Sequence, residues 1–557
     1  MRVVTTMHVL LSLLLAAGCA ADGAANDDGG EPPPEAPTFV SSAVCSDCHS
    51  RIYAPGTPTN WEGMRMAHRG DPPTEVDRAA VGPYSLWSGT MMAHAAQDPY
   101  WLAKVRFEAR ETPAAAATIE NTCLSCHAPA QQYAHRLTKQ PMRLDALDKM
   151  GSEGVTCTVC HQITPERLGS AESFTAGFAI NTEDRIYGPH ADPFPMPMRM
   201  HTGKTPTESA HMLESALCGT CHTVITPTLD AEGRTTGRFL EQATYLEWLA
   251  SDSPGQGQTC QSCHMPLLTG PEGEPVEQFI AHTPHGGFFG PTSPRKPFAQ
   301  HTFQGANVQM LGMLAELLPS ERTVLEVSAA RARKTLEGAL ELAVEAEIDN
   351  GGLTAVVNVQ NKTGHKLPSG FPSRRLWLRL IVTDQAGRAV FESGGFDATT
   401  GDLLHAQEVV APHNDVISRP EQTQIYEAVP ASSEGRRTVS LMRAAKWAKD
   451  NRLLPSGFRG DSALPEGVSD LSVEPVGVGD DADFAAGGDR VHYRIAEIAA
   501  DGPLRVRVEA LYQSFHSEHL AGMEVSGASA EEAAFLSAKE RHAAPVLVAQ
   551  AETEVSR

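Results

Sequence analysis

The C-terminal half of the chain alternates apolar and polar residues with the period of β-strands. Leu342, Val344, Ala346 and Ile348 occupy every second position, and a Gly351–Gly352 pair follows as a turn. The same alternation recurs in TAVVNVQN (354–361), WLRLIVTD (377–384) and LRVRVEALYQ (504–513). Short strands separated by turns predict a β-sandwich of the immunoglobulin-like kind over residues 341–540, with residues 541–557 as a C-terminal tail.

Upstream of this region the apolar period changes from two to three or four. Residues 306–340 place Leu325, Ala329, Ala332, Leu336 and Ala339 on one face of a helix, which predicts a helical connector. Residues 39–305 show few patterns that could build a core, so a bulky apolar cofactor is expected to supply the interior. The sequence therefore predicts a multidomain α+β protein, in which a helical and loop-rich domain precedes an all-β domain.

The N-terminus has the features of an export signal. A basic residue, Arg2, precedes the apolar stretch Val9–Ala17, which is too short to span a membrane as a mature helix. The stretch ends in LAAGC, which is similar to a bacterial lipobox and makes Cys19 the expected site of lipidation. Residues 1–18 are then a lipoprotein signal peptide, and the Gly-, Pro- and Asp-rich residues 19–38 a disordered tether. We expect an exported outer-membrane lipoprotein that faces the periplasm or the cell surface.

The charge of the chain excludes one class of partner. The formal net charge is −23, from 68 acidic against 45 basic residues. Because nucleic-acid binding needs a basic surface, we expect no nucleic acid as partner.

The cysteines carry the strongest signal. Eleven cysteines comprise Cys19 and five pairs with identical spacing, each followed at once by a histidine. The five motifs are Cys45, Cys48 and His49; Cys123, Cys126 and His127; Cys157, Cys160 and His161; Cys218, Cys221 and His222; Cys260, Cys263 and His264. C-x-x-C-H is the signature of c-type haem attachment, in which two thiols bond to the haem and the histidine binds its iron. Zinc sites or disulfides would not need a histidine after every pair, so we expect five covalently attached haem c groups.

The second axial ligand of each iron decides what the haem can do, because His or Met closes the iron whereas a vacancy admits a substrate. A repeat, WEGMRMAH (61–68) and WSGTMMAH (87–94), offers two equivalent ligand segments. The candidate distal ligands are Met66, His68, Met92, His94, His201, His211, His285, His301 and His365, with His282 and, more weakly, His135 and His413 as further histidines. His365 stands in the loop TGHKLPSGFPSRR of the predicted sandwich, from which it could reach a haem of the preceding domain. Arg374 and Arg375 in the same loop are candidate partners of haem propionates, or else form surface ion pairs.

Residues 39–520 resemble the bacterial multihaem c-type cytochromes related to hydroxylamine oxidoreductase and its tetrahaem electron acceptor. The resemblance rests on SGTMMAHAAQDPYW (88–101), EGVTCTVCHQ (153–162), CGTCHTV (218–224), QTCQSCHMP (258–266), HTFQGANVQML (301–311) and NKTGHKLPSGFPSRRLWL (361–378). In that family a W-x-x-S-x-H-A segment donates a distal ligand. Met92 falls at the place of its histidine here, which leaves Met92 and His94 as alternatives.

The resemblance implies haem attachment more firmly than catalysis. The chain has no C-x-x-C-K motif and five haem motifs rather than the eight typical of hydroxylamine oxidoreductase. We therefore expect an electron carrier whose partners are redox proteins and, through the lipid anchor, the membrane. An oxidoreductase that acts on a small nitrogen or sulfur compound at one open haem is the alternative. A third possibility is a structural or adhesive surface protein.

Overall fold

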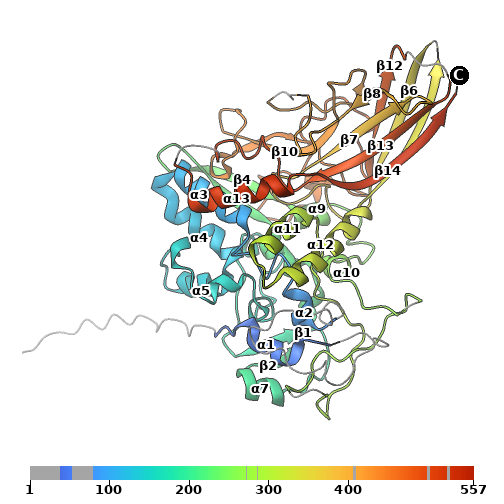
Figure 1. The fold of residues 1–557 in the computed structure, drawn as a ribbon. Coiled ribbons are helices and arrows are strands. Elements are labelled where there is room, and N and C mark those ends of the chain that lie inside the picture. Colours follow the sequence, from blue (N-terminus) through green and yellow to red (C-terminus); the bar gives the residue numbers. More distant parts are fainter. Residues whose placement is uncertain are drawn as a thin grey trace, which may run out of the picture. The chain divides into compact units, whose positions relative to one another are not determined.

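The computed structural model describes eight stretches of the chain: 38–52, 80–270, 272–284, 287–349, 351–405, 409–498, 502–523 and 527–556 (Figure 1). The predicted signal peptide and most of the tether lie outside them, as do Cys19, Met66, His68 and His285. No helix within these stretches is long and apolar enough to cross a membrane.

The first half of the chain consists mainly of short helices joined by loops, as the sparse apolar pattern predicts. Asp98 shows how one of these helices begins. Its carboxylate accepts hydrogen bonds from the backbone N–H groups of Tyr100 and Trp101. Pro99 follows as the first helical residue. The helices are α1 (Ser42–His49), α2 (Pro83–Trp87), α3 (Pro99–Glu111), α4 (Ala116–His127), α5 (Pro129–Leu137), α6 (Cys157–Cys160), α7 (Met196–Thr202), α8 (Ser215–His222), α9 (Thr244–Leu249) and α10 (Cys260–His264).

Two small sheets in this half were not predicted from the sequence. β1 (Arg185–Gly188) pairs in parallel with β2 (Thr205–Glu208), and β3 (Val224–Leu229) pairs antiparallel with β4 (Thr235–Gln242). Their strands span four to eight residues and do not alternate apolar with polar residues, so no period of two marks them in the sequence.

The predicted connector is helical and forms two helices. α11 (Val308–Leu317) ends just before Pro319, and α12 (Arg322–Glu337) follows. α12 buries Leu325 and Leu336, so the predicted face is the one that packs.

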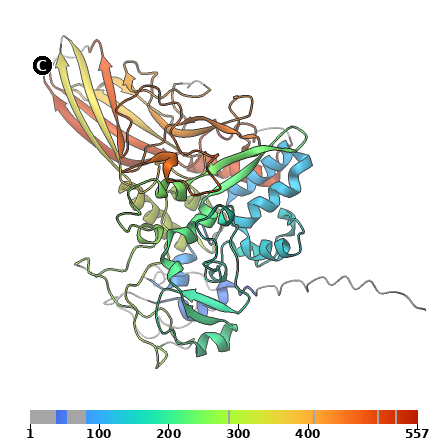
Figure 2. The same ribbon diagram turned by 180° about the vertical axis from the view of Figure 1, so that it is seen from behind.

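The second half contains two sheets around one core, with their strands side by side in Figures 1 and 2. One sheet has the order β11-β10-β7-β13-β14, with β8 paired to β7, and the other has the order β5-β6-β12-β9. The bounds are β5 (Leu340–Asp349), β6 (Gly352–Asn361), β7 (Arg375–Thr383), β8 (Ala389–Ser393), β9 (Val416–Ile417), β10 (Ile425–Ala431), β11 (Lys446–Asp450), β12 (Gly488–Ile495), β13 (Leu504–Gln513) and β14 (Val546–Val555). The molecule is thus mixed α+β, whereas the immunoglobulin-like class of the sandwich stays a prediction.

Strand β14 corrects the prediction of a C-terminal tail over residues 541–557. It pairs antiparallel with β13 and lies next to β5, at the edge where the two sheets meet. Val546 and Val548 are buried in the shared core. Leu547 lies between them and Ala549 follows, so the sequence shows no alternation with polar residues at this end of the strand. The helix α13 (Ala530–His542) precedes it.

One apolar cluster joins the two halves of the chain. Tyr100 and Phe107 of α3 pack with Met313 of α11 and with Phe535 of α13. The rings of Tyr100 and Phe535 are 5.1 Å apart. Helix α3, which packs on the motif-bearing helix α4, is therefore held against the C-terminal half by ordinary side-chain packing.

Candidate haem-binding site

Each of the five motifs occupies the end of a short helix. α1, α4, α8 and α10 finish at the motif histidine, and the histidine of α6 is its C-cap. In a helix, residues i, i+3 and i+4 share one face, so both thiols and the imidazole of a motif point to the same side. All ten motif cysteines are free thiols. Each motif thus presents the donor set that one haem c requires.

Four of the motif histidines are oriented by a backbone carbonyl. The Nδ1 atoms of His49, His127 and His161 lie 2.7, 2.8 and 2.6 Å from carbonyl oxygens, and His264 makes the same contact. A ring that donates its Nδ1–H in this way keeps Nε2 free as an acceptor, which is how proteins orient histidine ligands of metals. The four side chains are therefore prepared to bind iron through Nε2.

Burial lowers the pKa of four motif histidines, His49, His127, His161 and His222, and so favours the neutral imidazole that metal binding requires. It lowers the pKa of both His127 and His222 to about 4. For His222, the neighbouring His264 and Arg374 act in the same direction.

Two motif histidines face a second imidazole from a distant part of the chain. The rings of His264 and His365 are 6.3 Å apart between centroids, with 12° between their planes. The rings of His161 and His301 are 6.2 Å apart, with 14° between planes. The Nδ1 of His365 donates to the Lys366 carbonyl at 2.9 Å, so its Nε2 is free as well.

The two spacings match those expected for imidazoles that share one metal ion. A metal–imidazole bond is about 2 Å long and a ring nitrogen lies about 1.1 Å from the ring centre, so two imidazoles on opposite faces of one iron have centroids about 6.3 Å apart. Burial and the neighbouring His161 lower the pKa of His301 to about 3. Both pairs therefore fit a haem iron between them.

Two other predicted ligands are held by different groups. His211 is buried with both ring nitrogens in hydrogen bonds, to the Ile163 carbonyl at 2.9 Å and the Ser209 hydroxyl at 2.6 Å. His201 is exposed, and its Nε2 lies 3.0 Å from a carboxylate oxygen of Asp47. Either histidine would have to give up these contacts to bind iron.

Met92 and His94, the two alternatives of the repeat, lie in different surroundings. His94 is buried, donates its Nε2–H to the Ser88 carbonyl at 2.9 Å, and leaves Nδ1 without a partner. Met92 is half-buried. His282, by contrast, has both nitrogens within 2.8 Å of backbone carbonyl oxygens.

The two predicted propionate partners lie in different surroundings. Arg374 hydrogen-bonds to the Ser369 carbonyl and to Asn307, and its charge acts on His222. Arg375 is 1% exposed and pairs with Glu518 at 3.2 Å. Arg374 thus lies close to a motif histidine, whereas Arg375 belongs to an ion pair of the C-terminal half.

Neighbouring motifs contact one another directly. Three pairs of thiols from different motifs interact: Cys45 with Cys157, Cys126 with Cys221, and Cys218 with Cys260. Helix α1 packs on α6, and α10 packs on α8. Val159 of the third motif packs in one apolar cluster with Cys126 and Cys221, so the five motifs form one continuous group.

Sequence reasoning missed Trp101, whose ring stacks on that of His127 at 4.4 Å with 6° between planes. It also missed Glu241 of β4, whose negative charge acts on Cys123 and Cys126. Burial raises the pKa of Glu241 to about 7. No spacing in the sequence connects either residue with a motif.

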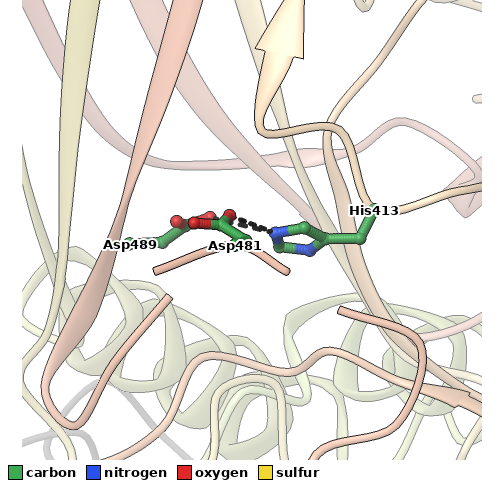
Figure 3. Close-up of side chains that lie close together, drawn as sticks. All are labelled: His413, Asp481 and Asp489. Carbon is green, nitrogen blue, oxygen red and sulfur yellow. Dashed lines mark hydrogen bonds and ion pairs between the residues drawn. The ribbon is translucent and has the colours of Figure 1, made fainter. Parts of the chain in front are cut away.

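A cluster of His413, Asp481 and Asp489 has the composition of a metal site (Figure 3). The Nε2 of His413 lies 2.8 Å from Asp481, while the amide groups of Gln424 and Asn451 both donate to Nδ1 at 2.9 Å. The Asn451 amide nitrogen also donates to a backbone carbonyl, which fixes its orientation. Because Nδ1 accepts, the ring proton is on Nε2 and points at Asp481. The cluster is therefore a buried hydrogen-bond network, and His413 has no free nitrogen for a metal ion.

Comparisons with known proteins agree with this donor set. Residues 82–162, which contain the second and third motifs, match the family described as "Cytochrome c554 and c-prime". A solved structure, a penta-heme cytochrome c552 from Thermochromatium tepidum, is similar with a TM-score of 0.50 and 18% identity, over 92% of this chain and 98% of that chain. No curated protein matches the chain. The family match and the similar fold support a multihaem c-type cytochrome.

Proposed function

We propose that this chain is an exported pentahaem c-type cytochrome that transfers electrons at the bacterial cell envelope. The observation that carries the proposal is the pair of facing imidazoles at His264 and His365, repeated at His161 and His301. Haem iron held between two histidines takes up and releases single electrons and has no position left for a substrate. The five adjacent attachment sites and the penta-heme cofactor content of the similar structure support the count of five.

The finer domain layout belongs to the same proposal. Residues 39–305 form the haem domain, residues 306–340 the connector, and the second half an immunoglobulin-like sandwich. Through His365 the sandwich supplies a distal ligand to the haem attached at Cys260 and Cys263. The C-terminal half then completes the cofactor site as well as covering it.

The proposed location rests on the N-terminal sequence. Cleavage before Cys19 and acylation of its thiol would anchor the protein in the outer membrane, beside redox proteins as partners. A Cys19→Ser variant tests this: it should lose incorporated fatty acid and leave the membrane fraction. If both remain unchanged, Cys19 is not the anchor.

Electron paramagnetic resonance of the oxidised, haem-loaded protein tests the main proposal. Low-spin signals from all five haems would show that every iron has both axial positions occupied by protein ligands, as an electron carrier requires. One stoichiometric high-spin haem would instead show an open iron.

An oxidoreductase that acts on a small nitrogen or sulfur compound is the second candidate, and Glu241 favours it. This carboxyl group is buried, has a pKa of about 7, and acts electrostatically on the attachment cysteines Cys123 and Cys126. Reduction of such compounds consumes protons, and a group with this pKa can supply them at neutral pH. Stoichiometric binding of cyanide or nitric oxide by one haem would favour this function over the carrier.

A further inference from the structure

The residue after His365 belongs to a buried network of four charged side chains. The Nζ of Lys366 lies 2.7 Å from Oδ2 of Asp450. Arg452 holds the same carboxylate with Nε at 2.7 Å and Nη2 at 2.8 Å, and its Nη1 pairs with Glu247 at 2.9 Å. These four side chains are between 0 and 6% exposed.

The network connects the His365 loop with α9, the helix that precedes α10 and its His264 in the chain. Glu247 lies on α9, and the adjacent Trp248 donates a hydrogen bond to the carbonyl of Gln258, two residues before α10. The second carboxylate oxygen of Glu247 accepts hydrogen bonds from the backbone N–H of Lys366 at 3.2 Å and from the Ser369 hydroxyl at 2.7 Å. One carboxylate therefore holds the loop of His365 at two points and binds Arg452 at a third.

The loop also approaches the haem-motif half closely at the residue before His365. A Cβ atom added at Gly364 would lie 2.7 Å from the Ser253 hydroxyl and 3.4 Å from Trp248. Ser253 and Trp248 belong to α9 and the segment after it. The backbone next to His365 is thus packed against this segment, and the ion network fixes the residues that follow.

A buried network of this kind is poorly explained by stability alone. Its two cations and two carboxylates sum to zero charge, but removing four ions from water costs several kcal/mol each, and apolar replacements of such networks are often as stable. A network of bidentate and branched contacts holds the segments that it joins in one fixed arrangement. Here it joins the loop of His365 to α9, which is hydrogen-bonded to the segment leading into the helix of His264.

We propose that Glu247 and Arg452 are positioning residues that hold the His365 imidazole at iron-binding distance from His264. The inference rests on the proposed haem ligation and extends it to side chains that are not themselves iron ligands. Without the Glu247 carboxylate, the loop loses the two hydrogen bonds from Lys366 and Ser369 that this side chain accepts. His365 then no longer stays at the 6.3 Å spacing that a shared iron requires.

The test compares Glu247→Gln with a matched control in the haem-loaded protein. Glu427→Gln is the control, because the Glu427 carboxylate is likewise buried and pairs with Lys449 at 3.1 Å on β10 and β11, and the hydrogen bonds described for this carboxylate do not involve residues 363–374. For Glu247→Gln we expect high-spin iron to rise by as much as one haem in five, with a shifted midpoint potential of that haem. For Glu427→Gln we expect the native spin count, whatever its effect on stability. Equal spin counts in native protein and Glu247→Gln would overturn the proposal.

A double variant keeps the test decisive if Glu247→Gln folds poorly. Glu247→Gln with Arg452→Met removes one charge of each sign, so no unpaired ion is left between them. We expect a folded protein with the same gain in high-spin iron. A folded double variant with only low-spin haem would show that the network does not position His365.

His365→Met separates this proposal from the ligation on which it rests. If His365→Met leaves every haem spectrum unchanged, His365 is no ligand and the ligation itself is wrong. If His365→Met changes one haem but both Glu247 variants leave the spectra unchanged, ligation stands and only the positioning role is refuted.

Discussion

The imidazoles of His264 and His365 lie 12° from parallel with their centroids 6.3 Å apart, although the two residues come from opposite halves of the chain. The first belongs to a cysteine motif at the end of α10, and the second to the loop between β6 and β7. Through this pair of side chains, the C-terminal half contributes a residue to the proposed haem site of the N-terminal half.

Replacement of His365 should remove the distal ligand of one haem iron. In His365→Ala we expect one low-spin haem to become high-spin, because the iron loses one of its two imidazoles. Electron paramagnetic resonance of the oxidised protein measures the change. His492→Ala is the control, since His492 is partly exposed and pairs with Asp483 at the surface. A native spectrum for His365→Ala would contradict the assignment.

Replacement of His301 should have the same effect on a different haem. His301 faces His161 at 6.2 Å, so His301→Ala is expected to convert the haem attached at Cys157 and Cys160. The double variant with His365→Ala should show two high-spin haems, because the two sites are separate. If the double variant shows one, the two histidines do not serve different irons.

The stacking of Trp101 on His127 predicts a loss of stability when the indole is removed. Trp101 is 9% exposed and packs on the imidazole at 4.4 Å. Trp101→Ala should lower the free energy of unfolding by about 3–5 kcal/mol, whereas Trp101→Phe, which retains an aromatic face, should lose much less. Denaturant unfolding followed by circular dichroism compares the two. Equal losses would show that the stack itself adds nothing.

Glu241 predicts a pH dependence of stability. Burial raises its pKa from the ordinary value of about 4.5 to about 7, so the folded protein binds this proton more tightly than the unfolded chain. Stability from this group is therefore lost as pH rises from about 4.5 to about 7, by on the order of 3 kcal/mol in total.

Glu241→Gln should remove that loss. We expect the variant to match the native protein at pH 4 and to exceed it in thermal stability at pH 8. The exposed Glu345→Gln serves as the control and should change neither. If the stability difference between Glu241→Gln and the native protein does not vary with pH, the carboxyl group is not buried as described.

Part of the fold could be predicted because its pattern is local and long. The alternation from Leu342 to Ile348 lies on β5, and the spacing from Leu325 to Leu336 lies on the buried face of α12. Strand β14 was mistaken for a tail, since its neighbour β13 is what makes those residues a strand. The short pairs β1–β2 and β3–β4 escaped prediction for the same reason.

The proposed haem attachment sites could be predicted from the sequence alone, because two thiols and an imidazole within one helical turn need no distant residue to be brought together. For the distal ligands the sequence supplied only a set of candidates. His365 and His301 stood among many histidines, and His211 and His201 were equally plausible until the fold placed them against other partners. Only the tertiary structure brought His301 to His161 and His365 to His264, since the pairing of residues far apart in sequence depends on how helices and sheets pack. The Glu247–Arg452 pair likewise could not be predicted, because a contact between α9 and the end of β11 produces no periodic pattern in the sequence.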